Sequence, residues 1–352
     1  MQVRGVFDEV GAGNGGQVAG VAKIVARELE RVILRFDGAL ESDLTAVERL
    51  VRHVEGYRGK MLRPTLAILS SLATRDTTGH GEADTPEDVI TVAAVIEMVH
   101  MATLVHDDVL DEADTRRRAA TVNTLEGNET AVIMGDLLIA SAYALCSTLP
   151  TPDAARVVAR ASVVTCTGEL LQLSRRNDLS LDEATYIEII DRKTAALIAA
   201  ACRLGVIASG AMDATRLAHA DRLERFGRLV GRAFQIQDDV LDLVGDERVV
   251  GKTLGVDAAK GKATLPLIAA LNDADAWTRG EILDLLDRAA HTQGRGGNAV
   301  RERLIEAGGV AFAQSRAQAY INEAKAELAT LPTNGARLVL EMLADAVVTR
   351  HH

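Results

Sequence analysis

This sequence of 352 residues contains few aromatic residues and few cysteines. Phe, Trp and Tyr together make up 3% of the chain, although hydrophobic residues reach 48%. A core must therefore be built from Ala, Leu, Val and Ile, which favours closely packed helices. The three cysteines, Cys146, Cys166 and Cys202, have no close spacing and fall in helical patterns, so we expect buried thiols rather than a disulfide, zinc or redox motif.

Targeting and membrane signals are also missing. The N-terminus lacks the basic and apolar regions of a signal peptide, and no apolar run approaches the roughly 18 residues that span a bilayer. Together with the cysteine pattern, this predicts a cytoplasmic protein.

Positive charge is scarce as well. The chain has 39 Lys and Arg against 50 Asp and Glu, a formal net charge of −11. This balance argues against a nucleic-acid partner, which requires an excess of basic side chains along a surface. Repulsion of an anionic substrate is screened beyond about 8 Å at physiological salt, so local cations and bound metal can still decide binding.

Acidic residues form the most informative pattern, because Asp-Asp-Val-Leu-Asp occurs twice, at 107–111 and 238–242. On a helix the first and last acids of each triplet share a face. Three like charges beside apolar residues are costly to desolvate and need neutralisation. Carboxylate oxygens suit a hard divalent cation, and Mg²⁺ prefers a few carboxylates plus waters and substrate phosphates. The predicted metal ligands are Asp107, Asp108, Asp111, Asp238, Asp239 and Asp242.

The alternative for a single such motif, in a chain with 50 acidic residues, is a solvated helix face. Two copies of identical form, each bordered by apolar residues, favour a metal site that takes a phosphorylated substrate.

A second motif is predicted to have no function. Gly11, Gly13 and Gly16 form a literal GxGxxG, a pattern that binds dinucleotides only between a strand and a helix of a βαβ unit. We instead expect residues 1–17 to be a flexible Gly-rich tail.

From residue 18 onward, helical periodicity dominates and predicts a single all-α domain over 18–352. Start signals place helices near 86, 152 and 181, the last through a capping box at Ser180 to Glu183. Loops are expected at 73–85, 112–127, 245–264 and 293–298. Because two of these loops follow the Asp triplets, the triplets should lie near the C-terminal ends of helices that face each other in a bundle.

Basic residues near these loops could bind diphosphate, since Arg grips phosphate oxygens in pairs and Lys adds a point charge. Taken singly, each is most often a solvated surface residue. The candidates are Lys60, Arg63, Arg116, Arg117, Arg118, Lys193, Lys252, Lys260 and Lys262.

In their order along the chain, these motifs resemble the trans-isoprenyl diphosphate synthases, the polyprenyl synthetase family. The resemblance extends from about residue 30 to 345. Its motifs are GKMLRP at 59–64, VHDDVLDEADTRRRAATVN at 105–123, GELLQ at 168–172, RKT at 192–194, FQIQDDVLD at 234–242, GKTLGVD at 251–257 and KGKATLP at 260–266.

The resemblance implies a bundle of long helices around a deep apolar cavity, usually dimeric. It implies a Mg²⁺-dependent prenyltransferase that joins isopentenyl diphosphate head-to-tail to an allylic diphosphate by ionisation, condensation and proton loss. The six aspartates would hold Mg²⁺ ions that bridge to the allylic diphosphate. A departure from the family is Arg118, at a position where Gly is frequent.

Further roles follow from the same resemblance. Arg116, Lys193 and Lys252 would contact the allylic diphosphate, and Lys262 is counted among the substrate-binding residues. Thr194 and Gln235 would face the reacting carbons and steady the cation. The residues implied for isopentenyl diphosphate are Gly59, Lys60, Arg63, His100 and Arg117.

Product length should depend on the helix that precedes the first triplet. Val99, Ala102 and Thr103 lie along one face, each turn about 5.4 Å further from Asp107. Small residues at 102 and 103 leave room for an all-trans product longer than C15, and Tyr143 is a candidate floor. The alternatives that stay open are close helix packing at Ala102 and ordinary core packing at Tyr143.

Competing functions remain. A geranylgeranyl diphosphate synthase is the alternative for the product, and a class I terpene cyclase or a non-catalytic subunit of a heteromeric synthase are more distant ones. Partners are expected to be the two diphosphates and a second copy of the chain, with transient membrane contact for product release.

Overall fold

The computed structural model describes residues 15–75, 85–117, 119–244, 262–291 and 297–350. Their regular secondary structure is helical apart from one short hairpin, so the all-α prediction is confirmed. Their contacts divide into two compact units. Unit 1 comprises the described residues within 1–162, 197–227 and 327–343, and unit 2 those within 163–196, 228–326 and 344–352. That 18–352 forms one domain stays a prediction.

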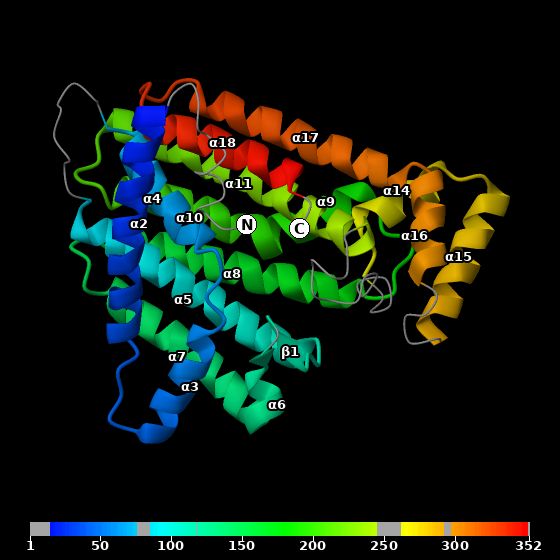
Figure 1. Cartoon of the computed structure of the whole chain (residues 1–352), viewed down its shortest axis with the longest axis horizontal. Helices are drawn as coiled ribbons and strands as arrows, with labels where there is room; N and C mark the ends of the chain where they lie inside the picture. The colour runs from blue at the N-terminus through cyan, green and yellow to red at the C-terminus, as the bar shows by residue number, and fades with distance from the viewer. Residues whose placement is uncertain (1–14, 76–84, 118, 245–261, 292–296, 351–352) are drawn as a thin grey trace. The chain divides into compact units, whose positions relative to one another are not determined.

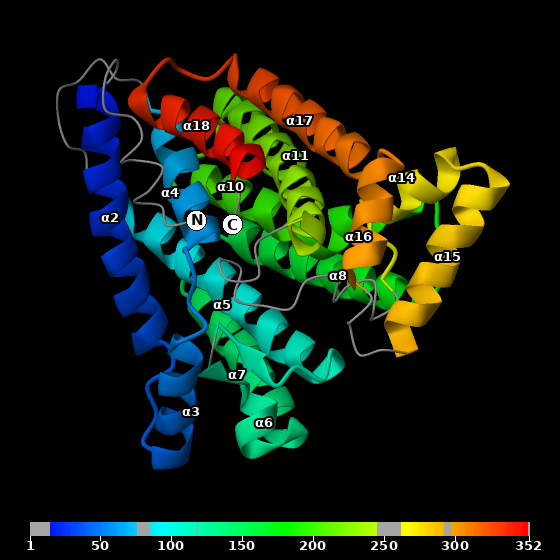
Figure 2. The same ribbon diagram turned by 45° about the vertical axis from the view of Figure 1, so that its right-hand side comes forward.

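Unit 1 is built around α5 (Glu87–Leu110), a helix that is apolar on nearly all sides and therefore buried. It packs against α2 (Gly15–Gly38), α4 (Leu62–Ala73) and α7 (Asn128–Cys146), as both ribbon views show (Figures 1 and 2). Its further elements are α3 (Thr45–Glu55), the antiparallel strands β1 (Thr115–Arg116) and β2 (Ala119–Ala120), α6 (Val122–Glu126) and most of α10 (Ala196–Ile207).

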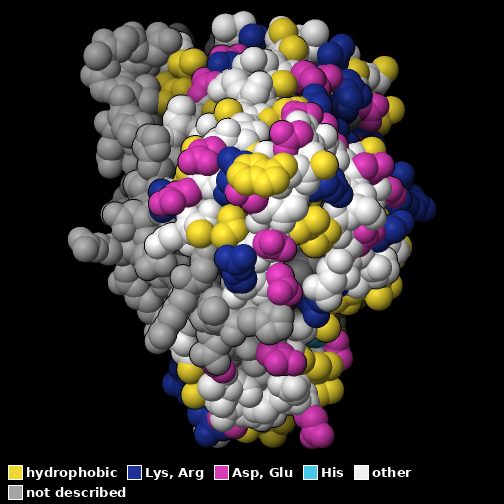
Figure 3. Space-filling model, turned by 90° about the vertical axis from the view of Figure 1, so that its right-hand side faces the viewer, with side chains coloured by type: hydrophobic (Ala, Val, Ile, Leu, Met, Phe, Trp, Pro, Cys, Tyr) yellow, Lys and Arg dark blue, Asp and Glu magenta, His cyan; other side chains and the backbone are white. Residues whose placement is uncertain are grey.

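Unit 2 contains α9 (Glu183–Ile190), η1 (Asp191–Ala195), α14 (Leu265–Asp273), α15 (Ala276–His291), α16 (Gly297–Glu306) and nearly all of α17 (Gly309–Leu328). Three helices contribute residues to both units: α8 (Asp153–Ser174), α11 (Ala214–Val244) and α18 (Gly335–Thr349). Within unit 2, Leu243 near the end of α11 packs into an apolar cluster with Leu267, Leu271, Ile282 and Leu304. On the face drawn in Figure 3, basic and acidic side chains are interspersed over the coloured surface.

Several predicted boundaries hold to within two residues: α5 begins at Glu87, α8 at Asp153 and α9 at Glu183. The capping box is wrong in detail, because Asp182 caps α9 by accepting from the Thr185 amide at 2.8 Å. An Asp carboxylate next to the helix start outcompetes Ser180, whose hydroxyl donates to Asp178 instead.

Two other segments differ from the expectation. The predicted loop at 112–127 contains β1, β2 and α6, because the chain folds back on itself directly after the first Asp triplet. Helix α2 begins at Gly15, three residues before the predicted start, whereas Gly11 and Gly13 lie outside the described residues.

The expectations about apolar runs and thiols need correction. Two helices, α5 and α7, are long and apolar enough by composition to cross a membrane, because a helical window tolerates the isolated charges that interrupt the sequence run. In α5, 78% of that window is buried inside the protein, as expected of a core helix. Cys146 and Cys202 are buried as predicted, but Cys166 is exposed, because its side of α8 points outward.

Candidate active site

The first Asp triplet ends helix α5, as predicted. Asp107 and Asp108 lie in its last turn, and Asp111 is the residue at its C-cap. Asp108 is 1% exposed. Arg116, on β1, donates to it from Nε at 2.9 Å and 3.0 Å and from Nη2 at 2.7 Å. This forked ion pair neutralises the buried carboxylate.

Tyr57 supports this arginine and was not anticipated from the sequence. The Arg116 guanidinium carbon lies 6.0 Å from the centre of the Tyr57 ring. The Tyr57 hydroxyl accepts from the Val122 amide at 3.0 Å, directly after the hairpin. Burial raises the pKa of Tyr57 to about 12, and the nearby Asp108 charge adds to the shift. The phenol therefore stays neutral and fixes the hairpin that carries Arg116.

Cationic side chains gather next to the middle of α5. The pKa of His100 lies well below its ordinary value because of burial and the positive charges of Arg63, Arg116 and Arg117. Burial lowers the pKa of Arg117 as well. The imidazole is therefore neutral at pH 7, and the positive charge is held by arginines.

Two further residues shape this cationic cluster. Glu97 is 3% exposed, and burial raises its pKa although Arg63, Arg117 and Arg58 favour its charged form. A Cβ on Gly59 would collide with the guanidinium of Arg117, so any larger residue there would displace this arginine from its present position. The structure thus brings together Gly59, Arg63, His100, Arg116 and Arg117, with the exposed Lys60 next to Gly59 in the chain.

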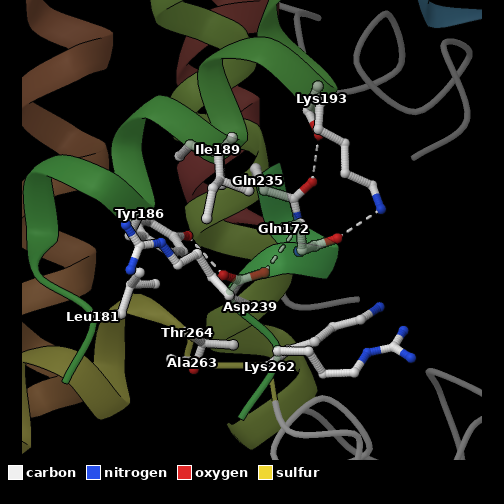
Figure 4. A pocket seen from close by; sticks show the side chains of 14 residues that line it. Gln172, Leu181, Tyr186, Ile189, Lys193, Gln235, Asp239, Lys262, Ala263 and Thr264 are labelled. Atoms are coloured by element: carbon white, nitrogen blue, oxygen red, sulfur yellow. Dashed lines mark hydrogen bonds between the residues drawn. The ribbon is translucent and has the colours of Figure 1, made fainter. Parts of the chain in front are cut away.

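The second Asp triplet lies near the C-terminal end of α11, also as predicted. Asp239 is 6% exposed. It accepts from the Tyr186 hydroxyl at 2.6 Å and from Gln235 Nε2 at 2.9 Å. Gln235 in turn accepts from the Thr194 hydroxyl at 2.8 Å (Figure 4). A continuous chain of hydrogen bonds therefore links the predicted Thr194 and Gln235 to the second triplet.

Lys193 lies beside this chain. Its ammonium group donates to Gln172 Oε1 at 2.8 Å and pairs with Glu169. Unit 2 contains a cavity of about 120 Å³ (Figure 4). The predicted site residues that line it are Lys193, Thr194, Gln235, Asp239 and Lys262. Arg175 and Arg176, which the sequence motifs did not indicate, line it as well. Lys252, Arg118 and Lys260 lie outside the described residues.

Arg350 is a further unexpected neighbour of the second triplet. Its Nη2 lies 2.6 Å from Asp238 Oδ1 and donates to the Phe234 carbonyl at 2.8 Å, while its guanidinium stacks 4.1 Å from the Phe234 ring centre. The side chain is only 10% exposed. No local motif marks this residue, because its partners are more than 100 positions away in sequence.

The carboxylates of both triplets are therefore engaged by protein groups, and within the described ranges no three His, Cys, Asp or Glu side chains gather into a metal-holding cluster. The donor chemistry nevertheless fits a hard divalent cation, because each triplet offers only carboxylate oxygens and Arg116 and Arg350 are already attracted to them. The first triplet belongs to unit 1 and the second to unit 2. The expectation that the two triplets face each other therefore stays a prediction.

The candidate residues for product length divide into two groups. Val99 and Ala102 are buried, and Thr103 is half-buried with its hydroxyl donating to the His100 carbonyl at 2.7 Å. Tyr143, by contrast, is 42% exposed, and the buried positions of α7 nearest to it are Ala142 and Cys146. Burial therefore gives the proposed floor at Tyr143 no support.

Comparison with known proteins identifies the family. The polyprenyl synthetase family model matches residues 45–302. The chain is 36% identical over 322 residues to the short chain isoprenyl diphosphate synthase of Methanothermobacter thermautotrophicus, covering 88% of this chain and 93% of the relative. It is 33% identical over 333 residues to the octaprenyl diphosphate synthase of Escherichia coli, covering 94% and 98%.

A solved structure agrees with these matches. A polyprenyl synthase of Caulobacter crescentus, complexed with calcium and isoprenyl diphosphate, superposes with a TM-score of 0.83 at 32% identity, covering 96% of this chain and 99% of that one. The chain belongs to the polyprenyl synthetase family. The prediction of a trans-polyprenyl diphosphate synthase enzyme is thereby confirmed at the level of the family.

Proposed function

We propose that this enzyme condenses isopentenyl diphosphate with an allylic diphosphate to give an all-trans polyprenyl diphosphate longer than C15. The observation that carries the proposal is the hydrogen-bond chain from Thr194 through Gln235 to Asp239, with Lys193 beside it. It connects a carboxylate suited to a cation with neutral dipoles suited to a carbocation, which is what ionisation of an allylic diphosphate requires.

The metal is proposed to be Mg²⁺. Asp107, Asp108 and Asp111 would hold it in one triplet, and Asp238, Asp239 and Asp242 in the other. The Caulobacter crescentus structure supports a divalent cation, because that protein is complexed with calcium and isoprenyl diphosphate. Bound Mg²⁺ would supply positive charge to the leaving diphosphate.

The protein's own groups have separate roles in the reaction. Arg116, Lys193 and Lys252 bind the allylic diphosphate, and Lys262 lines the same cavity as Lys193. When the C–O bond ionises, the hydroxyl of Thr194 and the amide of Gln235 present dipoles to the cation. The double bond of isopentenyl diphosphate then attacks, and the proton leaves with the departed diphosphate as its acceptor. Apolar walls exclude water, which would otherwise quench the cation.

Isopentenyl diphosphate is proposed to bind at the cationic cluster of unit 1, formed by Gly59, Lys60, Arg63, His100 and Arg117. The neutral imidazole of His100 is supported by its lowered pKa, which leaves it a hydrogen-bond donor without adding another charge to the arginines. Glycine at 59 leaves room for the Arg117 guanidinium.

A product longer than C15 is supported by the small residues at 102 and 103 and by the octaprenyl diphosphate synthase of Escherichia coli. The short chain synthase of Methanothermobacter thermautotrophicus keeps geranylgeranyl diphosphate as the alternative product. Both Asp triplets are intact, which disfavours a non-catalytic subunit, and the isopentenyl diphosphate site disfavours a terpene cyclase.

A cytoplasmic homodimer is the proposed form of the enzyme. Helix α7 supports a second copy, because Ile133 is 65% exposed, Val132 41% and Tyr143 42%. Apolar side chains this exposed along one helix are typical of an interface. Most of the apolar window of α5 is buried inside the protein, which supports the proposal that this helix is not a membrane anchor.

The test is product sizing. Labelled isopentenyl diphosphate is incubated with each primer from C5 to C20, and the dephosphorylated products are separated by length. Chains beyond C15 that require Mg²⁺ are expected, and Asp107→Asn should reduce their formation by at least about 100-fold. Hydrocarbons from farnesyl diphosphate alone, or no elongation with any primer, would contradict the proposal.

A further inference from the structure

A π-helical turn, η1, separates α9 from α10. The N–H of Ala196 donates to the carbonyl of Asp191, five residues earlier, where an α-helix would use the residue four earlier. Such turns are rare and occur frequently at functional sites. This one carries Lys193 and Thr194 in succession, and both line the cavity of unit 2. The shape of the turn therefore sets where these two groups point.

The first residue of the turn is held by two arginines of α11. Arg228 Nη1 donates to Asp191 Oδ2 at 2.6 Å, and Arg232 Nε donates to Asp191 Oδ1 at 2.7 Å. The Asp191 side chain is 17% exposed, so both carboxylate oxygens are bound away from bulk water. Arg232 is itself fixed against the ring of Tyr320, 5.5 Å from its centre.

The same face of α11 continues toward the second Asp triplet. Arg228, Arg232, Gln235 and Asp239 follow each other at intervals of three or four residues and share one side of the helix. The first two bind Asp191, Gln235 binds Thr194, and Asp239 binds Tyr186 of α9. The two ion pairs of Asp191 thus fix how η1 lies along α11, and this places Thr194 next to Gln235.

The opposite side of the turn is closed by α8. A Cβ on Gly168 would lie 2.6 Å from Arg192 Cβ and 2.6 Å from the Lys193 amide nitrogen. The extra residue of the π turn therefore bulges against a glycine while the arginine pair holds its beginning. If the turn relaxed to an α-helix, the side chains after it would rotate by about 100° relative to those before it.

We propose that Asp191, Arg228 and Arg232 form a clamp that maintains the π turn and thereby aims Lys193 at the diphosphate and Thr194 at the developing cation. Asp191 is then a positioning residue: it touches no substrate and acts through Thr194 and Lys193. This inference rests on the proposed function for its effect on catalysis, but the clamp itself can be tested without substrate.

The kinetic test compares Asp191→Asn with a matched control. Glu183→Gln removes the same charge from α9. Glu183 pairs with Arg316 at 2.6 Å and does not line the cavity. Because misplacement of a reacting group by about 1 Å can cost about 100-fold, we expect D191N to lower kcat by at least about 10-fold, with KM for isopentenyl diphosphate changed by less than about 2-fold. E183Q should retain the wild-type kcat.

A double-mutant cycle tests whether the effect passes through Thr194. In a Thr194→Ala background, D191N should cost clearly less than in the wild-type background, because one of the two groups that it positions is already gone. Equal losses in both backgrounds would overturn the proposal. Arg232→Gln, which leaves Arg228 on Asp191, serves if D191N does not fold. It should give a smaller loss of kcat that also shrinks in the Thr194→Ala background.

Hydrogen exchange separates the clamp from the proposed function. In the substrate-free protein, amides of residues 191–196 should exchange at least about 5-fold faster in D191N than in wild type or E183Q. If exchange rises but wild type elongates no prenyl diphosphate, the proposed function fails and the clamp stands. If wild type is active while D191N changes neither kcat nor exchange, the clamp is refuted.

Discussion

Removal of the Arg116 side chain should lower the free energy of unfolding, because it leaves the buried Asp108 carboxylate without its ion-pair partner. Asp108 is 1% exposed and accepts three hydrogen bonds from this arginine. Breaking a buried ion pair by deleting one partner costs about 3–5 kcal/mol, because the other charge stays buried and uncompensated. Arg116 is 23% exposed, so water can partly replace it, and we expect Arg116→Leu to cost about 3 kcal/mol.

The assay is urea or thermal unfolding with and without Mg²⁺. A loss of about 3 kcal/mol corresponds to a fall in Tm of very roughly 6 °C or more for a cooperative unit of 150 to 250 residues. If the first triplet binds Mg²⁺, the cation should restore more stability to the variant than to wild type, because it competes with no arginine there. The control is Arg156→Leu, since Arg156 pairs with Asp153 on the surface with 72% and 56% exposure and should change stability by less than about 1 kcal/mol.

The result that would refute this reasoning is a variant as stable as the Arg156 control. Equal stabilisation of wild type and R116L by Mg²⁺ would separately argue that the cation does not approach Asp108.

Three further outcomes are expected. The unfolded chain protonates His100 near pH 6.5 whereas the folded chain resists protonation, so stability should fall below pH 6.5 with a slope of up to about 1.4 kcal/mol per pH unit. His100→Gln should flatten that slope in urea titrations at pH 7 and 5.5, and an unchanged slope would exclude the imidazole. Ala102→Phe should shorten the products, whereas Tyr143→Ala, at an exposed site, should leave them unchanged in the same chain-length assay. Arg350→Gln should lower the Mg²⁺ concentration for half-maximal thermal stabilisation, because Asp238 is freed for the cation; no change would show that the pair does not oppose metal binding.

The sequence was most informative where chemistry and local spacing coincide. Both Asp triplets stand out because three like charges beside apolar residues are improbable without a ligand, and both indeed lie near helix C-termini. Thr194 and Gln235, placed together by family resemblance, share a hydrogen bond of 2.8 Å.

What the sequence could not predict depends on packing between distant segments. Tyr186 reaches Asp239 across 53 positions, and Asp191 reaches Arg232 across 41. No periodic pattern encodes a π turn, since one additional residue within a helix leaves the local composition unchanged. For Tyr57 and Tyr186 the sequence offered one weak signal. The whole chain has four tyrosines, so each buried phenol was worth examining as a site residue.

The placement of the triplets at helix ends has a consequence for the free protein. The C-terminal end of a helix carries a partial negative charge of about half an electron, so carboxylates there are repelled by the backbone as well as by one another. Helices α5 and α11 both carry their acids at this pole. Arg116 and Arg350 offset part of this repulsion in the free protein, and a divalent ion would be attracted by peptide dipoles in addition to side chains.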